Sequence, residues 1–389
     1  MEKTLKFPPD FLWGTATAAY QVEGGINNCD WSKIYPAGRA CDHYNLYEQD
    51  FDLIEELGNN AYRFSIEWSR IEPEKGNFDK QEIDHYRKVL SALKKRNVKS
   101  FVTLWHFSTP DWLAKESGWA NPGAIRYFER YVKVVVEELG DLADFWITLN
   151  EPDFIVSLGY VKGIWPPRSH NILLAPRVYR NLVEAHKRAY EIIHKTKKNA
   201  RVGIAMNCTY SEPHNHKSPL DRFSASLWEY VDNHLFLDLI KDYHDYIGLN
   251  YYFHDRLKFP FLRRNEDKTI SDLGWEIYPK GIFHALKEIY GRYKKPIYIT
   301  ENGIADKDDK SRNAYIKDHL FWIHRAIGEK VEVDGYLHWS LMDNFEWEKG
   351  FSPCFGLIEV DRNNLKRKLR PSAYAYAEIC KNNQLIIDN

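Results

Sequence analysis

Cysteine is scarce in this chain of 389 residues, and its distribution argues against two common kinds of site. There are five cysteines, an odd number, and no two of them form a Cys-x-x-Cys pair. A disulfide framework and a zinc site are therefore not indicated, and we expect buried free thiols. The five are Cys29, Cys41, Cys208, Cys354 and Cys380.

The sequence also lacks an excess of charge of either sign. Acidic residues number 55 and basic residues 54, which gives a formal net charge of -1 at pH 7. A chain with this balance has no bulk attraction for nucleic acid or for a membrane, so we expect no nucleic-acid partner.

Long hydrophobic runs are missing as well. No stretch approaches the roughly 18 consecutive apolar residues that a membrane span needs. The amino-terminal stretch MEKTLKFPPDFLWG lacks the apolar core of a signal peptide. We therefore expect no membrane span and a cytoplasmic location.

Neither linkers nor glycine-rich phosphate loops are found. No Pro/Ser-rich segment, shift of composition or finer repeat divides the chain, so we expect one domain over residues 1–389. No strand-like run is followed by a glycine-rich loop, which disfavours a doubly wound open sheet, the main alternative fold. The basic run LKRKLR at 365–370 is expected to be a solvated segment.

Aromatic residues, by contrast, are abundant. The chain has 13 Trp, 25 Tyr and 20 Phe, which make 15% of its residues. Aromatic rings pack against the apolar faces of sugars and aryl groups, and Trp and Tyr keep a donor for hydroxyl groups. A place in the core explains any single ring equally well, but so many rings suggest that some line a binding site.

Eight short runs have the composition of β-strands, and stretches with helical spacing separate them. Strands that alternate with helices indicate a parallel sheet, and eight strands predict a (β/α)8 TIM barrel with its active site at the carboxyl-terminal ends of the strands. Two helical stretches end on EELG, at 55–58 and 137–140, where we expect left-handed glycines. The eight runs are FLWGTA near 11, AYRFS near 61, SFVTLW near 100, FWITL near 145, VGIAM near 202, YIGLN near 246, IYIT near 297 and GYLHWS near 335.

Two of these runs lead directly to a glutamate. Glu151 follows WITLN and Glu301 follows YIT, although a carboxylate is costly to bury unpaired. A barrel would bring both side chains to one mouth. Two carboxyl groups that face each other across a pocket are typical of enzymes that hydrolyse glycosides. For each residue alone, a helix cap at Glu151 and a structural ion pair at Glu301 are the alternatives.

The sequences around both glutamates resemble those of family 1 glycoside hydrolases, the retaining β-glucosidase and β-galactosidase family. TLNEP at 148–152 is similar to the acid/base motif of that family, and ITENG at 299–303 to its nucleophile motif. The resemblance follows the family's order from one end of the chain to the other. Further motifs that share it are FLWGTATAAYQVEGG at 11–25, AYRFSIEWSRIEP at 61–73, GLNYY at 248–252 and HWSLMDNFEWEKGF at 338–351.

This resemblance implies an enzyme that hydrolyses terminal β-D-glucosides or β-D-galactosides with retention, in two steps through a covalent glycosyl-enzyme. Glu301 would be the nucleophile, and Glu151 would protonate the leaving oxygen and then activate water. Arg63 and Tyr252 match family residues that contact the nucleophile. A cation and a hydrogen-bond donor at that place would keep Glu301 ionised.

The resemblance also implies how the sugar is held. Trp339 would form the stacking floor, and Asn150, beside the acid, would hold the 2-hydroxyl. We expect a small β-glycoside or oligosaccharide as the partner, and neither a cofactor nor a metal. The residues assigned to hydroxyl contacts are Gln21, His106, Asn150, Glu346 and Trp347.

The leaving-group side of the pocket is the least defined part of the resemblance. GIWPPRS at 163–169 is expected to border it, with Trp165 either stacking on an aglycone or anchoring its loop. Phe355 is a further pocket candidate. The connection before the sixth strand is shorter than is usual in the family, which would widen the mouth or change the oligomer.

Two other functions stay open at this point. Relatives that act on 6-phosphoglycosides carry a Ser, Lys and Tyr set after the eighth strand, whereas this chain has Glu346 and Trp347 there and only Lys349 as a partial match. A catalytically silent sugar-binding barrel would not need both Glu151 and Glu301. A Schiff-base aldolase is disfavoured because no run has a lysine in its interior. The sequence leaves open glucose or galactose, and the oligomeric state.

Overall fold

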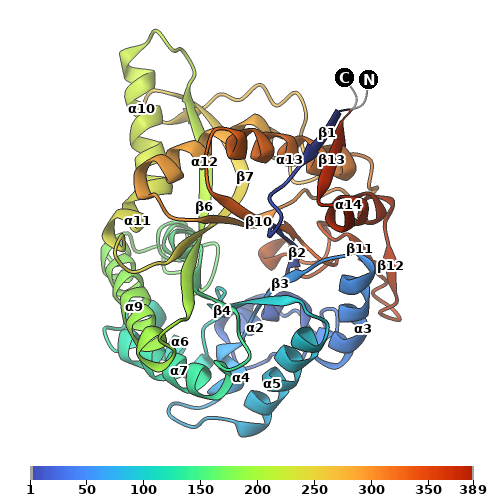
Figure 1. Ribbon diagram of the computed structural model, residues 1–389. Helices are drawn as coiled ribbons and strands as arrows, with labels where there is room; N and C mark the ends of the chain where they lie inside the picture. The colour runs from blue at the N-terminus through green and yellow to red at the C-terminus, as the bar shows by residue number, and fades with distance from the viewer. Residues whose placement is uncertain (1–2, 388–389) are drawn as a thin grey trace.

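The computed structural model describes residues 3–387, and a closed ring of parallel strands lies at its centre (Figure 1). Each strand pairs with the next and the last pairs with the first, which confirms the predicted (β/α)8 TIM barrel. All eight predicted runs are strands. In ring order they are β2 (Leu12–Ala16), β3 (Ala61–Ser65), β4 (Lys99–Trp105), β5 (Phe145–Asn150), β6 (Arg201–Pro213), β7 (Tyr246–Lys258), β9 (Ile297–Asn302) and β10 (Val333–Trp339).

Helices follow the strands and cover the outside of the barrel. The longer ones are α3 (His43–Glu56), α5 (Lys80–Lys95), α7 (Ala124–Leu139), α9 (Ala175–Thr196), α10 (Pro219–Glu229), α12 (Lys280–Tyr293), α13 (Arg312–Gly328) and α14 (Pro371–Asn382). Helix α5 is amphipathic: its apolar positions with helical spacing, Ile83, Tyr86, Leu90 and Leu93, are all buried. Within residues 3–387 no helix combines the length and the apolar character needed to cross a membrane.

Shorter elements complete the chain between and around these. The short helical ones are α1 (Ala19–Val22), α2 (Asp30–Ile34), α4 (Trp68–Ile71), α6 (Asp111–Lys115), η1 (Gly118–Ala120), α8 (Pro152–Phe154), η2 (Ile155–Val161), η3 (Tyr230–His234), α11 (Leu235–Leu239) and η4 (Trp347–Lys349). Outside the ring, β1 (Lys3–Lys6) pairs with β13 (Gln384–Ile387), β11 (Ile358–Val360) with β12 (Arg367–Leu369), and β8 (Leu262–Arg263) with the end of β7.

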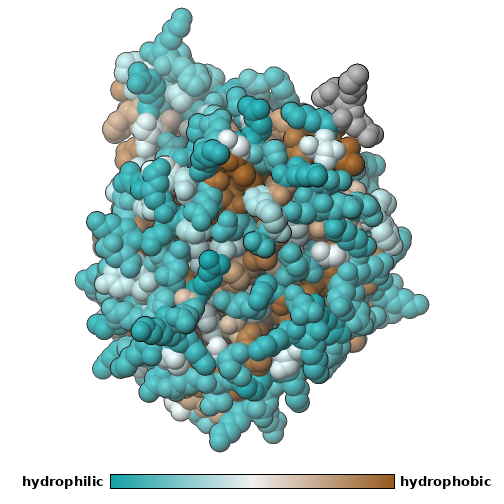
Figure 2. All heavy atoms as spheres, in the orientation of Figure 1, coloured by the Kyte–Doolittle hydropathy of each residue, from teal (hydrophilic) through white to brown (hydrophobic). Residues whose placement is uncertain are grey.

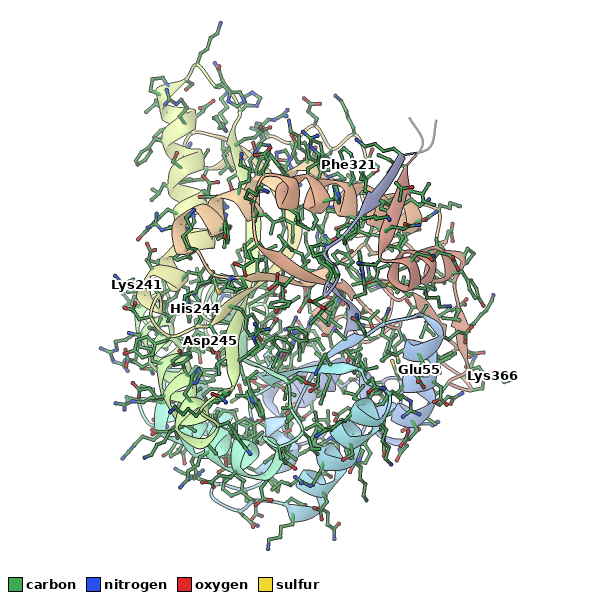
Figure 3. All side chains as sticks on the ribbon, in the orientation of Figure 1. Glu55, Lys241, His244, Asp245, Phe321 and Lys366 are labelled. Carbon is green, nitrogen blue, oxygen red and sulfur yellow. The ribbon has the colours of Figure 1, made fainter. Side chains whose placement is uncertain are left out.

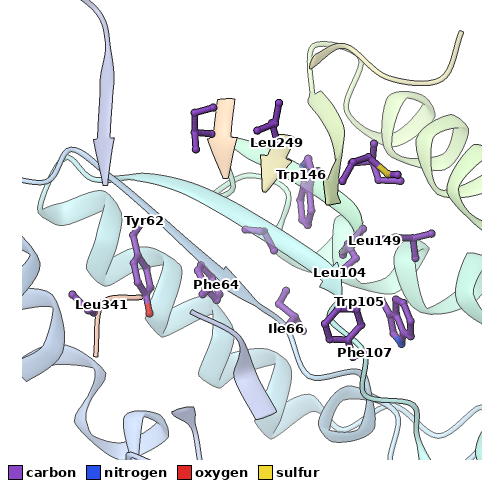
Figure 4. Close-up of a cluster of buried hydrophobic side chains, with 14 of the residues drawn as sticks. Tyr62, Phe64, Ile66, Leu104, Trp105, Phe107, Trp146, Leu149, Leu249 and Leu341 are labelled. Atoms are coloured by element: carbon purple, nitrogen blue, oxygen red, sulfur yellow. The ribbon is translucent and has the colours of Figure 1, made fainter. Parts of the chain in front are cut away.

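Side chains alternate between the two sides of each barrel strand. On β3, Tyr62 and Phe64 point outward and pack beneath the helices, where they join one large buried cluster with Trp146 of β5 (Figure 4). Ala61 and Arg63 of the same strand point into the barrel. The helix shell and the barrel interior are thus two separate layers of core.

Aromatic side chains fill the amino-terminal half of the barrel interior. The rings of Phe101 and Phe145 stack with centroids 4.2 Å apart, and those of Tyr246 and Tyr298 lie 5.2 Å apart, edge to face. Because this end is packed, the barrel is open only at the carboxyl-terminal ends of its strands.

A carboxylate joins the elements at the packed end. Asp245 directly precedes β7 (Figure 3) and accepts hydrogen bonds from the backbone N of Val202 at 2.8 Å, Tyr190 Oη at 3.0 Å and His194 Nε2 at 2.9 Å. These partners come from β6 and α9. Asp245 therefore stabilises the end of the barrel opposite the mouth.

The two EELG glycines differ. Gly58 has a φ of 67° and adopts the left-handed conformation, as predicted. Gly140 has a φ of -69°, so the prediction is wrong there. Glycine instead avoids a backbone clash at that position, because an added Cβ would lie 2.5 Å from the backbone O of Val136.

The basic run 365–370 is not simply solvated, which corrects the sequence-based prediction. The side chain of Arg367 is 1% exposed and pairs with the buried Asp50 at 2.8 Å. Arg370 is also buried and pairs with Asp343 at 2.8 Å. The alternate residues of β12 turn toward the barrel, so that only part of the run reaches solvent.

All five cysteines are free, as predicted. Four of them are buried, and Cys354 is half-buried. Their thiols therefore belong to the packing of the core.

Candidate active site

Glu301 lies near the end of β9, and two strands supply donors to its carboxylate. Arg63 of β3 donates from Nη1 to Oε1 at 2.5 Å, and Tyr252 of β7 donates from Oη to Oε2 at 2.9 Å. Arg63 is itself fixed, since its Nη2 donates to Oδ1 of Asn150 at 2.6 Å and its Nε to Oγ1 of Thr103 at 3.1 Å. Both oxygens of Glu301 are therefore held in one orientation.

Glu151 is the first residue after β5 and has an unusual backbone. Its φ is 39° and its ψ is 60°, a left-handed conformation that is uncommon for a residue other than glycine, and Pro152 begins α8 directly after it. Oε1 of Glu151 accepts from Nδ2 of Asn250 at 2.8 Å, and Oδ1 of Asn250 accepts from Thr300 at 2.7 Å. Backbone strain of this kind is typical of functional sites.

Electrostatics separate the two carboxyl groups. Burial, and then the charge of Glu301, raise the pKa of Glu151 well above its usual range. Burial also raises the pKa of Glu301, but the Arg63 cation and the Tyr252 hydroxyl oppose this rise. Glu151 is therefore the group that stays protonated, and Glu301 is the one that its neighbours stabilise as an anion.

Two buried polar atoms near the glutamates have no partner. Nδ2 of Asn150 donates to Nε2 of His106 at 3.2 Å, which leaves the proton of the neutral His106 ring on Nδ1, and this atom is unpaired. Gln21 donates from Nε2 to Oδ1 of Asn344 at 3.0 Å and to Oε2 of Glu346 at 3.3 Å, while its Oε1 is unpaired. Buried polar atoms without a partner are rare in folded proteins, so a ligand is the expected partner.

A cavity of about 150 Å³ opens at the mouth of the barrel. Eight of the ten predicted site residues line it, namely His106, Asn150, Glu151, Tyr252, Glu301, Trp339, Glu346 and Trp347. Arg63 and Gln21 are fully buried and stand behind the wall, where Arg63 contacts Glu301 and Gln21 contacts Glu346.

Glu346 introduces a third carboxyl group into the cavity. Burial, followed by the charges of Glu301 and Glu348, raises the pKa of Glu346 to about 8. Near neutral pH a large share of this group is therefore protonated, so it can donate as well as accept a hydrogen bond.

The outer wall of the cavity is apolar. Trp165 lines it and also donates from Nε1 to Oε2 of Glu348 at 2.6 Å, so it borders the cavity and anchors its loop at once. Phe355 lines the cavity, as predicted. The remaining apolar residues of the wall are Phe107, Phe154, Leu158, Phe253, Leu273 and Trp275.

Sequence reasoning missed Asn250 and most of the outer wall. Asn250 stands two residues before Tyr252 in GLNYY, and its position at the end of the predicted run YIGLN was the available signal. Phe154, Phe253 and Trp275 gave no such signal, because their residue types are equally common in a core. Tyr251, by pleat alternation, faces away from the cavity and donates to the backbone O of Tyr278 at 2.9 Å.

Comparison with known proteins identifies the family. The sequence pattern of Glycosyl hydrolase family 1 matches residues 3–251 and 237–385. A beta-glycosidase from Pyrococcus horikoshii has a similar structure, with a TM-score of 0.93 and 38% identity over 98% of this chain and 96% of that one. A beta-glucosidase from Thermotoga maritima in complex with glucoimidazole has a TM-score of 0.90 and 35% identity, over 97% of this chain and 99% of that one.

A beta-galactosidase from Pyrococcus woesei is 30% identical over 97% of each chain. These matches confirm the resemblance seen in the motifs, and they extend over nearly the full length of the chain and of its relatives. The chain therefore belongs to glycosyl hydrolase family 1 and is a retaining glycoside hydrolase.

Proposed function

We propose that the enzyme releases a terminal β-D-glucosyl or β-D-galactosyl unit from a small β-glycoside, with Glu301 as nucleophile and Glu151 as acid and base. The observation that carries this assignment is the unequal environment of two buried glutamates in one cavity. Arg63 and Tyr252 hold the carboxylate of Glu301, whereas the charge of Glu301 helps to keep Glu151 protonated.

In the first step, a carboxylate oxygen of Glu301 attacks the anomeric carbon and forms an ester bond with it. The bond from that carbon to the leaving oxygen breaks, and Glu151 gives its proton to this oxygen. The fixed orientation of the Glu301 oxygens favours the attack, because little reorganisation is needed at the moment of reaction.

In the second step, Glu151 takes a proton from water, and the resulting hydroxide displaces Glu301 from the anomeric carbon. Esterified Glu301 carries no charge, so one cause of the high pKa of Glu151 is gone and that pKa falls. Glu151 thus becomes a base when a base is needed. Titration of a stalled glycosyl-enzyme checks this, since an unchanged Glu151 pKa would remove the support for the switch.

The unpaired atoms around the cavity support the sugar contacts. Nδ1 of His106 is a free donor, and a partly protonated Glu346 can serve hydroxyl groups as donor or acceptor. Gln21 holds Glu346 from behind, and its free Oε1 offers a further acceptor. Trp339 lines the cavity and is the proposed stacking floor for the sugar. Asn150 remains the candidate for the 2-hydroxyl.

The complex of the Thermotoga relative with glucoimidazole, a glucose-like ligand, supports a glycoside of similar size as the substrate here. Hydrolysis of a 6-phosphoglycoside is disfavoured, because the one Lys or Arg that lines the cavity among residues 3–387, Lys349, already pairs with Glu348 at 3.6 Å. A cytoplasmic location stays a prediction, which the five free thiols support.

Covalent trapping tests the assignment of Glu301. A 2-deoxy-2-fluoro-β-glucoside with a good leaving group should form a stable ester, and digestion with mass spectrometry should find the sugar on the peptide that contains Glu301. The variant Glu301→Gln, a matched control, should take no label. A sugar on Glu151 or Glu346, or no sugar on the active wild-type enzyme, would overturn the assignment and leave a silent barrel or another chemistry in its place.

A further inference from the structure

Exposed hydrophobic side chains are concentrated in one part of the surface. Of the 18 large hydrophobic side chains that are exposed in the described residues, 15 lie between residues 161 and 270. The largest group, here called the apolar ridge, lies on α10, on η3 and on the hairpin after β7. Its members are Leu220, Phe223, Leu227, Trp228, Tyr230, Val231, Phe259, Phe261 and Leu262.

The ridge is one continuous surface rather than two. The rings of Trp228 on α10 and Phe261 on the hairpin lie 6.0 Å apart. In Figure 1, α10 projects from the upper left of the molecule, and Figure 2 shows hydrophobic atoms along the flank of this projection. Large contiguous apolar patches on a protein surface usually mark an interaction site.

Helix α10 is amphipathic, but its apolar face is exposed and its polar face packs against the barrel. Leu220, Phe223 and Leu227 recur every three to four residues on the exposed face, and Phe223 is 56% exposed. The face that packs against the barrel carries small and polar residues, with Asp221 and Ser224 both buried. A helix that only covered the barrel would turn its apolar face inward, so this one presents that face to something else.

Basic side chains surround the ridge. The stretch RLKFPFLRR at 256–264 contains four cations and no acid, in a chain whose net charge is -1. Lys217, Arg222, Lys258 and Arg264 are exposed, and no carboxylate among residues 3–387 pairs with any of them within 4.0 Å. The cations are therefore available to an anionic partner.

The ridge is also preformed. Asp221 accepts hydrogen bonds from the backbone N of Phe259 at Oδ1 and of Asn215 at Oδ2, both at 3.1 Å. This buried carboxylate fixes the hairpin to the start of α10. The apolar and basic groups therefore need little reordering to bind.

We propose that the apolar ridge docks on an anionic lipid surface, with its apolar side chains among the acyl chains and its cations on the headgroups. The combination of aromatic residues with a basic rim is complementary to such a surface. A second copy of the chain fits less well. A two-fold dimer through the ridge would bring the unpaired cations of both copies together, and like charges at an interface repel.

Docking would orient the enzyme on the bilayer. Strand β7 carries Tyr252 in the cavity, and Phe259 of the ridge directly follows its last residue; seven residues of extended chain span roughly 20 Å. The ridge and the mouth of the cavity thus lie on the same side of the barrel. The proposal does not depend on which glycoside the enzyme cleaves.

Vesicle flotation tests the proposal with the full chain. Wild-type protein should float with vesicles of equal parts phosphatidylglycerol and phosphatidylcholine, and less with pure phosphatidylcholine or at high salt. The double variant Phe223→Ser/Phe261→Ser should lose at least tenfold in partitioning. Lys258→Gln/Arg264→Gln should lose about thirtyfold, or about fivefold for each cation removed.

Matched controls lie far from the ridge. Tyr374→Ser removes a ring that is also 56% exposed, and Lys366→Gln removes a solvated cation on the hairpin of β11 and β12 (Figure 3). Both should float like wild type, and all variants should hydrolyse a soluble aryl β-glucoside at the wild-type rate, which shows that they fold.

Two results would overturn the proposal: a wild-type protein that does not bind anionic vesicles, or ridge variants that float as well as the wild-type protein does. If the wild-type protein forms a dimer and binds no vesicles, and if only Phe223→Ser/Phe261→Ser dissociates this dimer, the ridge is a self-association surface instead.

Discussion

Glu151 and Glu301 are the same residue type in one cavity, and their neighbours make them different. Arg63 and Tyr252 donate to the two oxygens of Glu301, which favours its anion. Glu151 is buried close enough to Glu301 for the charge of one to raise the pKa of the other. The division into nucleophile and acid thus follows from the donors around each glutamate.

Replacing Glu151 should impair substrates according to their leaving group. Glu151→Ala removes the proton donor, so kcat/KM for a methyl or alkyl β-glucoside should fall about 100-fold to 10,000-fold. A dinitrophenyl β-glucoside needs no proton on its leaving oxygen and should lose far less in kcat/KM. Steady-state kinetics on both substrates measure this ratio, and equal losses on the two would show that Glu151 is not the acid.

Asn250 should set the alkaline limb of the pH profile. Hydrogen bonding from Asn250 lowers the pKa of Glu151 and also that of Glu301, so Asn250→Ala should raise both pKa values. Because Glu151 acts in its protonated form, the alkaline limb of kcat/KM should move to higher pH. Tyr252→Phe is the matched comparison: it removes a donor from Glu301, raises the pKa of Glu301 and should move the acidic limb upward instead. An alkaline limb that moves as far in Tyr252→Phe as in Asn250→Ala would contradict the separate roles.

Among the residues of the site, the sequence predicted those at strand ends best. Glu151 directly follows β5 and Glu301 is the last residue but one of β9, and a barrel must bring such residues together, whereas Tyr252 lies inside β7, which continues to Lys258. Asn250 was missed because an asparagine near a strand end is equally common as a turn residue. The outer wall comes from α8, η2 and loops, whose path no strand pattern predicts.

At the scale of elements, local signals explain where a helix begins. Asp79 precedes α5 and accepts hydrogen bonds from the backbone N of Gln81 at 2.8 Å and of Glu82 at 3.3 Å. Asp79→Ala should lower the free energy of unfolding by about 1 kcal/mol, because these groups lose their acceptor. Urea unfolding measures the change. Asp84→Ala, an exposed acid on the same helix, should change it little; equal effects would mean that the cap is not the cause.

Elements also show where sequence patterns fail. Gly58 and Gly140 end the same motif, yet only Gly58 is left-handed; at Gly140 an added Cβ would lie 2.5 Å from the backbone O of Val136. The orientation of α10 could not be predicted from the sequence either. Its apolar spacing predicts a helix but does not say which face packs against the barrel. That choice depends on β6 and β7, which lie beneath it.

At the scale of the whole molecule, buried ion pairs join distant parts of the chain. Arg367 near the carboxyl terminus pairs with Asp50 of α3, and both side chains are almost fully buried. Arg367→Leu should lower the free energy of unfolding by about 3–5 kcal/mol at pH 7, since a buried carboxylate loses its cation. Lys368→Ala, an exposed neighbour, is the control.

The cost of Arg367→Leu should depend on pH. His43 and Arg367 hold the pKa of Asp50 below its usual value, against the effect of burial. A depressed pKa contributes stability above the pKa of the unfolded chain, and this contribution is lost as the pH falls through the folded value. The difference between wild type and variant should therefore shrink in acid. A difference that grows as the pH falls would contradict this account of the pair.

The extent of the domain stays a prediction. Pairing of β1 with β13 brings the first and last described segments of the chain side by side (Figure 1), which supports our proposal of one domain over residues 1–389. The composition gave no sign of the apolar ridge, because the net charge of the chain is nearly zero and its basic rim forms only when residues near 217–222 and 256–264 meet in space.

The most direct test of the central claim is a proton NMR time course of the hydrolysis of an aryl β-glucoside. The measurement follows which anomer of the free sugar appears before mutarotation mixes the two. A double displacement through Glu301 and Glu151 predicts that the β-anomer appears first. If the α-anomer appeared first, water would attack directly, and Glu301 would not be the nucleophile.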